Sequence, residues 1–233
     1  MNTTLIILGV IIAILIYVLW YYYYPSNSAV LSQKANLNAA NPDITSLNNP
    51  TNTRYGYGIW IYVNSWNNQN DKIIFSRAKN ITLRLDKSSP TLYCDIVMSD
   101  GTTVNKTMIT DNFPLQKWVY VIVSIDNQFL DCYLDGKLVK STRLYQKKGN
   151  TTLIPLVPPS ETTPIKLGSS IPFDAVVASF TRWSSPVDPQ TAWSTYIGGN
   201  TPTGLGKMGN LGSYGANLSI LQNNSEYSKI TLF

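Results

Sequence analysis

The chain has 233 residues and a formal net charge of +5, and 13% of its residues are charged, about half the share that is usual in globular proteins. The basic residues are scattered and form no arginine cluster, so we do not expect a nucleic-acid-binding protein. Histidine is absent and glutamate occurs only at Glu161 and Glu226, which removes the commonest general base and limits carboxylate pairs. The composition therefore argues against an enzyme.

An uncharged apolar segment runs from Leu5 to Tyr24 and is followed by Pro25. A helix of this length spans roughly 30 Å, the thickness of the hydrocarbon core of a bilayer. The segment ends in five rings of the kind that prefers the membrane interface: Trp20, Tyr21, Tyr22, Tyr23 and Tyr24. We predict a transmembrane anchor with an aromatic belt over residues 1–25. A cleaved signal peptide and a buried core helix remain alternatives, although the basic start of a signal peptide is missing.

Residues 26–53 are rich in Asn, Ser, Thr and Ala and show no sustained hydrophobic period. This composition predicts a linker that lies along its neighbours or stays mobile.

Residues 54–199 contain short alternating segments that are rich in aromatic and β-branched residues and separated by turn residues. This pattern is typical of an all-β sandwich. A short helix is expected only at Pro189–Ile197, ended by Gly198 and Gly199. Alternation places Cys94 and Cys132 on inward faces, as two buried thiols or as a disulfide.

The remaining tail, residues 200–233, is Gly-rich and then alternates on either side of Asn223–Asn224. This pattern indicates a last hairpin or an extended arm. We expect its apolar end, Leu232–Phe233, to dock on this domain or on a neighbour.

The block FPLQKWVYVIVSIDNQFLDCYLDGKLVKS, residues 113–141, resembles the laminin-G/concanavalin A-like family. Trp118 opens one strand of the block, and Asp135–Gly136 supplies the tight turn of the next hairpin. With YGIWIYVNSW upstream and IKLGSS downstream, the resemblance covers roughly Tyr55 to Gly199. It implies a mainly β jelly-roll sandwich, here preceded by one N-terminal transmembrane helix.

The order of anchor, linker, jelly roll and tail resembles virion proteins of large icosahedral DNA viruses of the algal-virus type. That resemblance implies a minor capsid protein at the interface between the inner membrane of the virion and the capsid. The implied partners are the lipid bilayer, the major capsid protein and other minor capsid proteins.

A membrane-anchored carbohydrate-binding module is the alternative, because jelly rolls bind sugars through aromatic platforms and amide side chains. Four residues form the candidate rim: Asn64, Trp66, Asn67 and Asn68. Trp183 and Trp193 are further candidates, although packing in the sandwich is the simpler role for strand tryptophans. Asp174 is the best single calcium candidate of a laminin-G module, but no second carboxylate lies near it in sequence. We therefore predict no metal and no cofactor, and the glucanase pattern Glu-x-Asp-x-x-Glu is absent.

Overall fold

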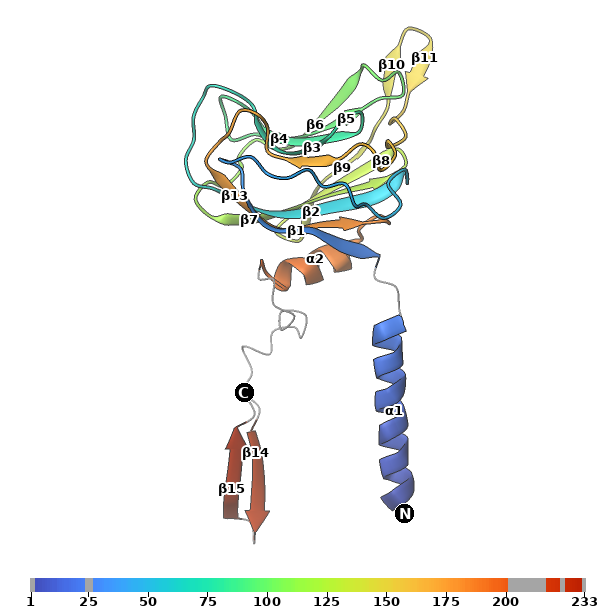
Figure 1. Cartoon of the computed structure of the whole chain (residues 1–233), viewed down its shortest axis with the longest axis vertical. Coiled ribbons are helices and arrows are strands. Elements are labelled where there is room, and N and C mark those ends of the chain that lie inside the picture. The colour runs from blue at the N-terminus through green and yellow to red at the C-terminus, as the bar shows by residue number, and fades with distance from the viewer. Residues whose placement is uncertain (1–2, 24–26, 201–216, 223–224, 232–233) are drawn as a thin grey trace.

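The computed structural model describes residues 3–23, 27–200, 217–222 and 225–231, and within these the side chains of 8–9, 11–19 and 27–200. Two antiparallel sheets pack face to face (Figure 1). The six-stranded sheet contains, in spatial order, β1 (Ser28–Asn36), β13 (Ala175–Trp183), β2 (Arg54–Val63), β7 (Trp118–Asp126), β8 (Phe129–Leu134) and β9 (Lys137–Arg143). The five-stranded sheet contains β12 (Ile165–Leu167), β3 (Lys72–Arg77), β4 (Ile81–Leu85), β5 (Leu92–Val97) and β6 (Val104–Thr110). The predicted β-sandwich is confirmed.

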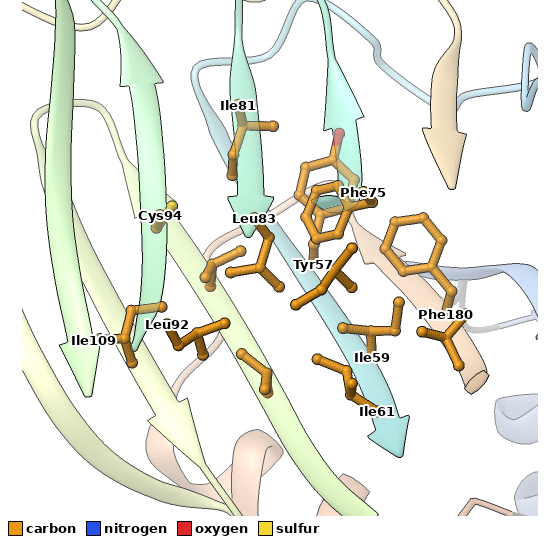
Figure 2. Close-up of a cluster of buried hydrophobic side chains, with 14 of the residues drawn as sticks. Tyr57, Ile59, Ile61, Phe75, Ile81, Leu83, Leu92, Cys94, Ile109 and Phe180 are labelled. Carbon is orange, nitrogen blue, oxygen red and sulfur yellow. The ribbon is translucent and has the colours of Figure 1, made fainter. Parts of the chain in front are cut away.

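Alternation in the strands produces the core between the sheets. In β2, Tyr57, Ile59 and Ile61 point inward and are almost completely buried. Figure 2 shows them facing side chains of the five-stranded sheet. The rings of Phe75 and Phe180 meet there with centroids 4.9 Å apart. This contact joins one sheet to the other through desolvated aromatic surface.

The two cysteines face this core from opposite sheets, as the alternation predicts. Cys94 lies on β5 and Cys132 on β8, and both are free thiols with 0% exposure. Burial raises the pKa of the Cys132 thiol to about 12 and also raises the pKa of Cys94. Of the two alternatives, the structure therefore has buried thiols rather than a disulfide.

A second layer covers the outer face of the six-stranded sheet. Helix α2 (Pro189–Ile197) crosses this face on the side away from the five-stranded sheet (Figure 1). Its predicted bounds are confirmed, and Asp188 caps it by accepting hydrogen bonds from two backbone N–H groups. Glycine is required at Gly58 beneath this layer, because a Cβ there would lie 2.8 Å from the Trp183 ring.

Residues 26–53 were expected to form a linker, but the described part, residues 27–53, carries a strand and packed loops. Strand β1 pairs with β13, and Leu37 is buried in the core. The buried guanidinium of Arg77 donates to the carbonyls of Pro50, Pro159 and Ser160. Arg182 likewise donates to the carbonyls of Asn48 and Asn49. These contacts between distant segments hold a sequence that has little periodicity of its own.

Helix α1 (Thr3–Tyr23) covers most of the predicted anchor. Its described apolar side chains are exposed, with Ile14, Leu15 and Ile16 each more than half accessible. Counting only residues that the structure describes, no helix is long and apolar enough to cross a membrane. The side chains of the predicted belt, Trp20–Tyr24, lie outside the described set, so the belt stays a prediction.

Two hairpins complete the described chain: β10 (Gln146–Lys148) with β11 (Thr151–Leu153), and β14 (Asn217–Gln222) with β15 (Ser225–Thr231). The second hairpin is the alternative that the tail sequence allowed on either side of residues 223–224. The apolar end Leu232–Phe233 lies outside the described residues.

Candidate functional site: two aromatic surfaces and a pocket

The loop that follows β2 is fastened to the start of β13 by Asp174. The carboxylate accepts hydrogen bonds from Asn64 Nδ2 at 2.7 Å and from Ser65 Oγ at 2.8 Å, both at Oδ2. The backbone N–H of Asn64 also donates to the carbonyl of Asp174, at 2.9 Å. Asp174 is therefore a clamp between two segments. Within the described residues, no group of three or more Cys, Asp or Glu side chains is placed to hold a metal ion.

The next residues of the predicted rim are also engaged within the protein. Trp66 donates its indole N–H to Asn68 Oδ1 at 2.9 Å, and Asn67 Oδ1 accepts from the N–H of Gln69. The ammonium of Lys72 lies 4.0 Å from the centroid of the Trp66 ring. The structure thus brings the predicted rim residues together, but it gives the central ring internal partners.

Lys72 joins this loop to the backbone of neighbouring segments. Its residue is only 2% exposed, and its ammonium donates to the carbonyls of Asn70 and Lys87 at 3.1 and 3.2 Å. Burial lowers the pKa of Lys72, an effect that the nearby carboxylates of Asp71 and Asp86 oppose. The ring of Trp66 adds a cation–π contact. Sequence reasoning missed Lys72 because the residue opens a strand and carries no binding signature.

A second aromatic surface surrounds α2 on the outer face of the six-stranded sheet. Trp60 stacks between Tyr120 and Tyr196, with centroid distances of 5.0 and 5.6 Å. Trp60 and Trp183 are 7% exposed, so the packing role expected of them is confirmed. Trp193, by contrast, is 46% exposed. Trp193 and Ile197 are four residues apart, a spacing that places both on one face of a helix. This spacing is the sequence signal by which the exposed face could have been found.

A pocket of about 320 Å³ lies where the β7–β8 turn meets the loop 154–158. Tyr55, Ile125 and Leu156 contribute apolar wall. At its rim, Asn127 Oδ1 accepts from the hydroxyl of Thr53 at 2.9 Å. The lining contains no charged side chain, so the pocket can take a small apolar group but offers no acid–base chemistry.

The two glutamates and the aspartates around Arg84 are the carboxylates to consider for glycoside cleavage. Glu161 is exposed in the loop that leads to β12, and the side chain of Glu226 lies outside the described residues. The carboxylate of Asp95 accepts from Arg84 Nε at 2.7 Å, and Asp71 Oδ2 lies 3.2 Å from the same guanidinium. These carboxylates neutralise a buried arginine.

The fold is shared with binding domains of other proteins. The chain is similar to the binding domain of botulinum neurotoxin serotype D, with a TM-score of 0.57 and 13% identity over 72% of this chain and 43% of that one. It is similarly close, at a TM-score of 0.54 and 14% identity, to the serotype D ligand-binding domain in complex with N-acetylneuraminic acid, over 72% of this chain and 42% of that one. The chain thus spans less than half the length of these domains, and identities this low establish the fold alone.

Among curated proteins, no sequence matches this chain. A family model does match, and it extends over residues 34–191, which include every strand from β2 to β13. Its description covers both sugar-binding and sugar-cleaving members. By this match the chain belongs to the concanavalin A-like lectin/glucanases superfamily, as a laminin-G-type domain.

Proposed function

We propose that this chain is a non-enzymatic structural protein that residues 1–25 anchor in a lipid bilayer and whose sandwich binds neighbouring proteins. The uncharged run from Leu5 to Tyr24 and the exposed apolar side chains of α1 support the anchor. The absence of histidine and the pairing of Asp95 and Asp71 with Arg84 support a role without catalysis. The proposal assigns the chain to the membrane as a single-pass protein.

The observation that carries this proposal is the short connection between helix and sandwich. Three residues separate Tyr23 from Asn27, so the Cα atoms of these two residues lie within roughly 15 Å of each other. Asn27 is already fixed to the sandwich, since its carbonyl accepts from the N–H of Ser184 at 2.9 Å. A membrane-embedded α1 would therefore hold the sandwich directly at the bilayer surface.

The setting we propose is a virion with an internal membrane. The support is the resemblance of the overall arrangement to virion proteins, together with the low share of charged residues, which makes surfaces easy to desolvate. Strands β9 and β6 end their sheets and carry exposed apolar residues, among them Leu138 and Met108. Such edges can pair with strands of the major capsid protein or of other minor capsid proteins.

Extraction of purified particles tests this role. A protein held by both lipid and shell should stay with the particle in mild detergent and leave only when the shell is also disrupted. Release by detergent alone would contradict the bridge. Retention after lipid removal, combined with cross-links from β6 or β9 to a shell protein, would support it.

Carbohydrate binding is the second candidate, and membership of a superfamily that includes lectins favours it. The internal partners of Trp66 weigh against the rim predicted from sequence. A glycan array with the full-length chain in detergent micelles tests this function. Selective binding that Trp66→Phe leaves intact and Trp193→Ser abolishes would place the sugar site on α2.

A further inference from the structure

Helix α2 separates a buried side from an exposed side. Ala192 is completely buried against the sheet, whereas Trp193 and Ile197, one turn apart, are 46% and 41% exposed. The β8–β9 turn supports the helix from below, because a Cβ at Gly136 would lie 2.9 Å from Trp193 Cε3. The exposed side chains are therefore fixed on a packed helix.

These side chains continue into a wider apolar surface, which we call the α2 patch: Trp118, Leu138, Trp193, Tyr196 and Ile197. Tyr196 stacks on Trp60 at 5.6 Å, and both Trp118 and Tyr196 pack against the buried outer layer. Leu138 lies opposite Tyr133 in the sheet and is 49% exposed. The exposed lysines Lys117 and Lys137 adjoin the patch along the chain.

The α2 patch lies on the same side of the sandwich as the point where the proposed anchor joins it. Ser184, which donates to the carbonyl of Asn27, lies four residues before the capping residue Asp188 of α2. The entry of the anchor and the start of α2 are therefore neighbours in the outer layer. In Figure 1, α1 and α2 both lie beyond the six-stranded sheet, opposite the five-stranded sheet.

We propose that the α2 patch lies in the headgroup region of the bilayer that holds α1, an inference that rests on the proposed function. Tryptophan and tyrosine prefer this region because the ring is apolar while the N–H or O–H stays hydrated. Lysines beside the patch reach lipid phosphates while their aliphatic stems stay on apolar surface. A small surface suffices, because the tether keeps its local concentration at the membrane high.

Spin-label accessibility of the full-length chain in liposomes that contain anionic phospholipid tests the inference. The label goes on Ser194→Cys, an exposed position on α2 next to Trp193, with Met108→Cys on β6 as the matched control. Cys94 and Cys132 are fully buried and will not take up label in the folded protein. We expect oxygen, which partitions into lipid, to relax the Ser194→Cys label more than a water-soluble nickel chelate does, and the reverse at Met108→Cys.

Each alternative occupant gives a different result. Suppose that the chains float with the liposomes and that the nickel chelate reaches the Ser194→Cys label as well as it reaches the Met108→Cys label. Helix α2 then lies in water, which overturns the inference and leaves the anchor intact. Low access to both reagents means that protein, such as residues 201–233, covers the patch, and this also overturns the inference. Chains that do not float contradict the proposed function itself. Adding Trp193→Ser and Ile197→Ser should abolish the oxygen preference while flotation persists, and a preserved preference would contradict the role of these two side chains.

Discussion

The loop around Trp66 and helix α2 each place a tryptophan near the surface, but the two rings have opposite surroundings. Trp66 gives its N–H to Asn68 and its ring face to Lys72, and it packs against the core. Trp193 contacts Tyr196 on one side, with centroids 5.7 Å apart, and is 46% exposed. An aromatic residue next to asparagines is thus a poor indicator of a binding surface until its partners are known. The predictions below test this contrast through the different effects of substitutions in the two regions.

The largest effect is expected from Trp66→Ala. The substitution removes packing against the core and leaves the buried ammonium of Lys72 without its ring, so the free energy of unfolding should fall by about 2–4 kcal/mol. Trp66→Phe, the matched control, keeps a ring but loses the hydrogen bond to Asn68 and should cost about 1 kcal/mol. Urea unfolding followed by circular dichroism measures both. Equal and small losses would mean that Trp66 is a surface residue free to bind ligands.

Gly58→Ala tests how tightly the outer layer packs beneath α2. A Cβ at this position would lie 2.5 Å from Tyr120 Oη and 2.8 Å from the Trp183 ring, so we expect a loss of about 1–3 kcal/mol in unfolding free energy. Within the described residues, the buried hydroxyl of Tyr120 has no hydrogen-bond partner. Tyr120→Phe should therefore be nearly neutral alone and should restore part of the stability lost in Gly58→Ala. Absence of this rescue in the double mutant would show that the layer adapts elsewhere.

Asp188→Ala removes the cap of α2 and should cost about 1 kcal/mol. Hydrogen bonds from the Thr191 side chain and backbone, and from the Gln190 backbone, hold the pKa of Asp188 below its usual value. Because the folded-state pKa is lowered, the charged cap stabilises the protein above the unfolded-state pKa, near 4, and this contribution disappears as the pH falls through the lowered pKa. Asp188→Asn keeps an acceptor and should lose this pH dependence. The free energy of unfolding of the wild type and of Asp188→Asn should be compared between about pH 6 and pH 2, a range that includes the usual pKa of Asp. Parallel curves for the two proteins would contradict the assignment.

The smallest effect on stability is expected from Trp193→Ser, at about 1 kcal/mol or less, because the ring is half in solvent before the change. Its effect should appear instead in contact with lipid. Thermal unfolding in detergent measures the first quantity, and label accessibility in liposomes measures the second. A loss of stability as large as that of Trp66→Ala would remove the contrast between the two regions.

Local signals were sufficient for much of this fold. The alternating sequences of β2 and β7, rich in aromatic and β-branched residues, predict strands, and Pro189 with Gly198 marks the bounds of α2, because each pattern acts within a few neighbouring residues. Strand β1 could not be predicted in this way. Its sequence does not alternate, and its partner β13 lies about 150 residues away along the chain. Long-range pairing, together with arginines that donate to distant carbonyls, turned an expected linker into part of the sandwich.

The candidate site was predictable to a similar degree. The sequence brings Asn64, Trp66 and Asn68 together because they are close along the chain. It does not show that Asp174 would accept a hydrogen bond from Asn64, or that the ammonium of Lys72 would lie over the ring of Trp66, since these contacts depend on the tertiary fold. The exposure of Trp193 is equally a tertiary property, because it depends on the face of α2 that meets Gly136.

The most direct test of the account is whether the apolar run from Leu5 to Tyr24, which α1 covers almost completely, keeps the full-length chain in a membrane. Ile11→Lys combined with Ile14→Lys places two charges in the middle of the run, each costing about 2.5–3.5 kcal/mol on insertion, whereas Thr3→Lys combined with Thr4→Lys places the same charges at its start. After alkaline carbonate extraction of membranes, we expect the wild type and the Thr3/Thr4 variant in the pellet and the Ile11/Ile14 variant in the supernatant. Wild-type chain in the supernatant would contradict the anchor, and with it the proposal that the sandwich lies on a bilayer.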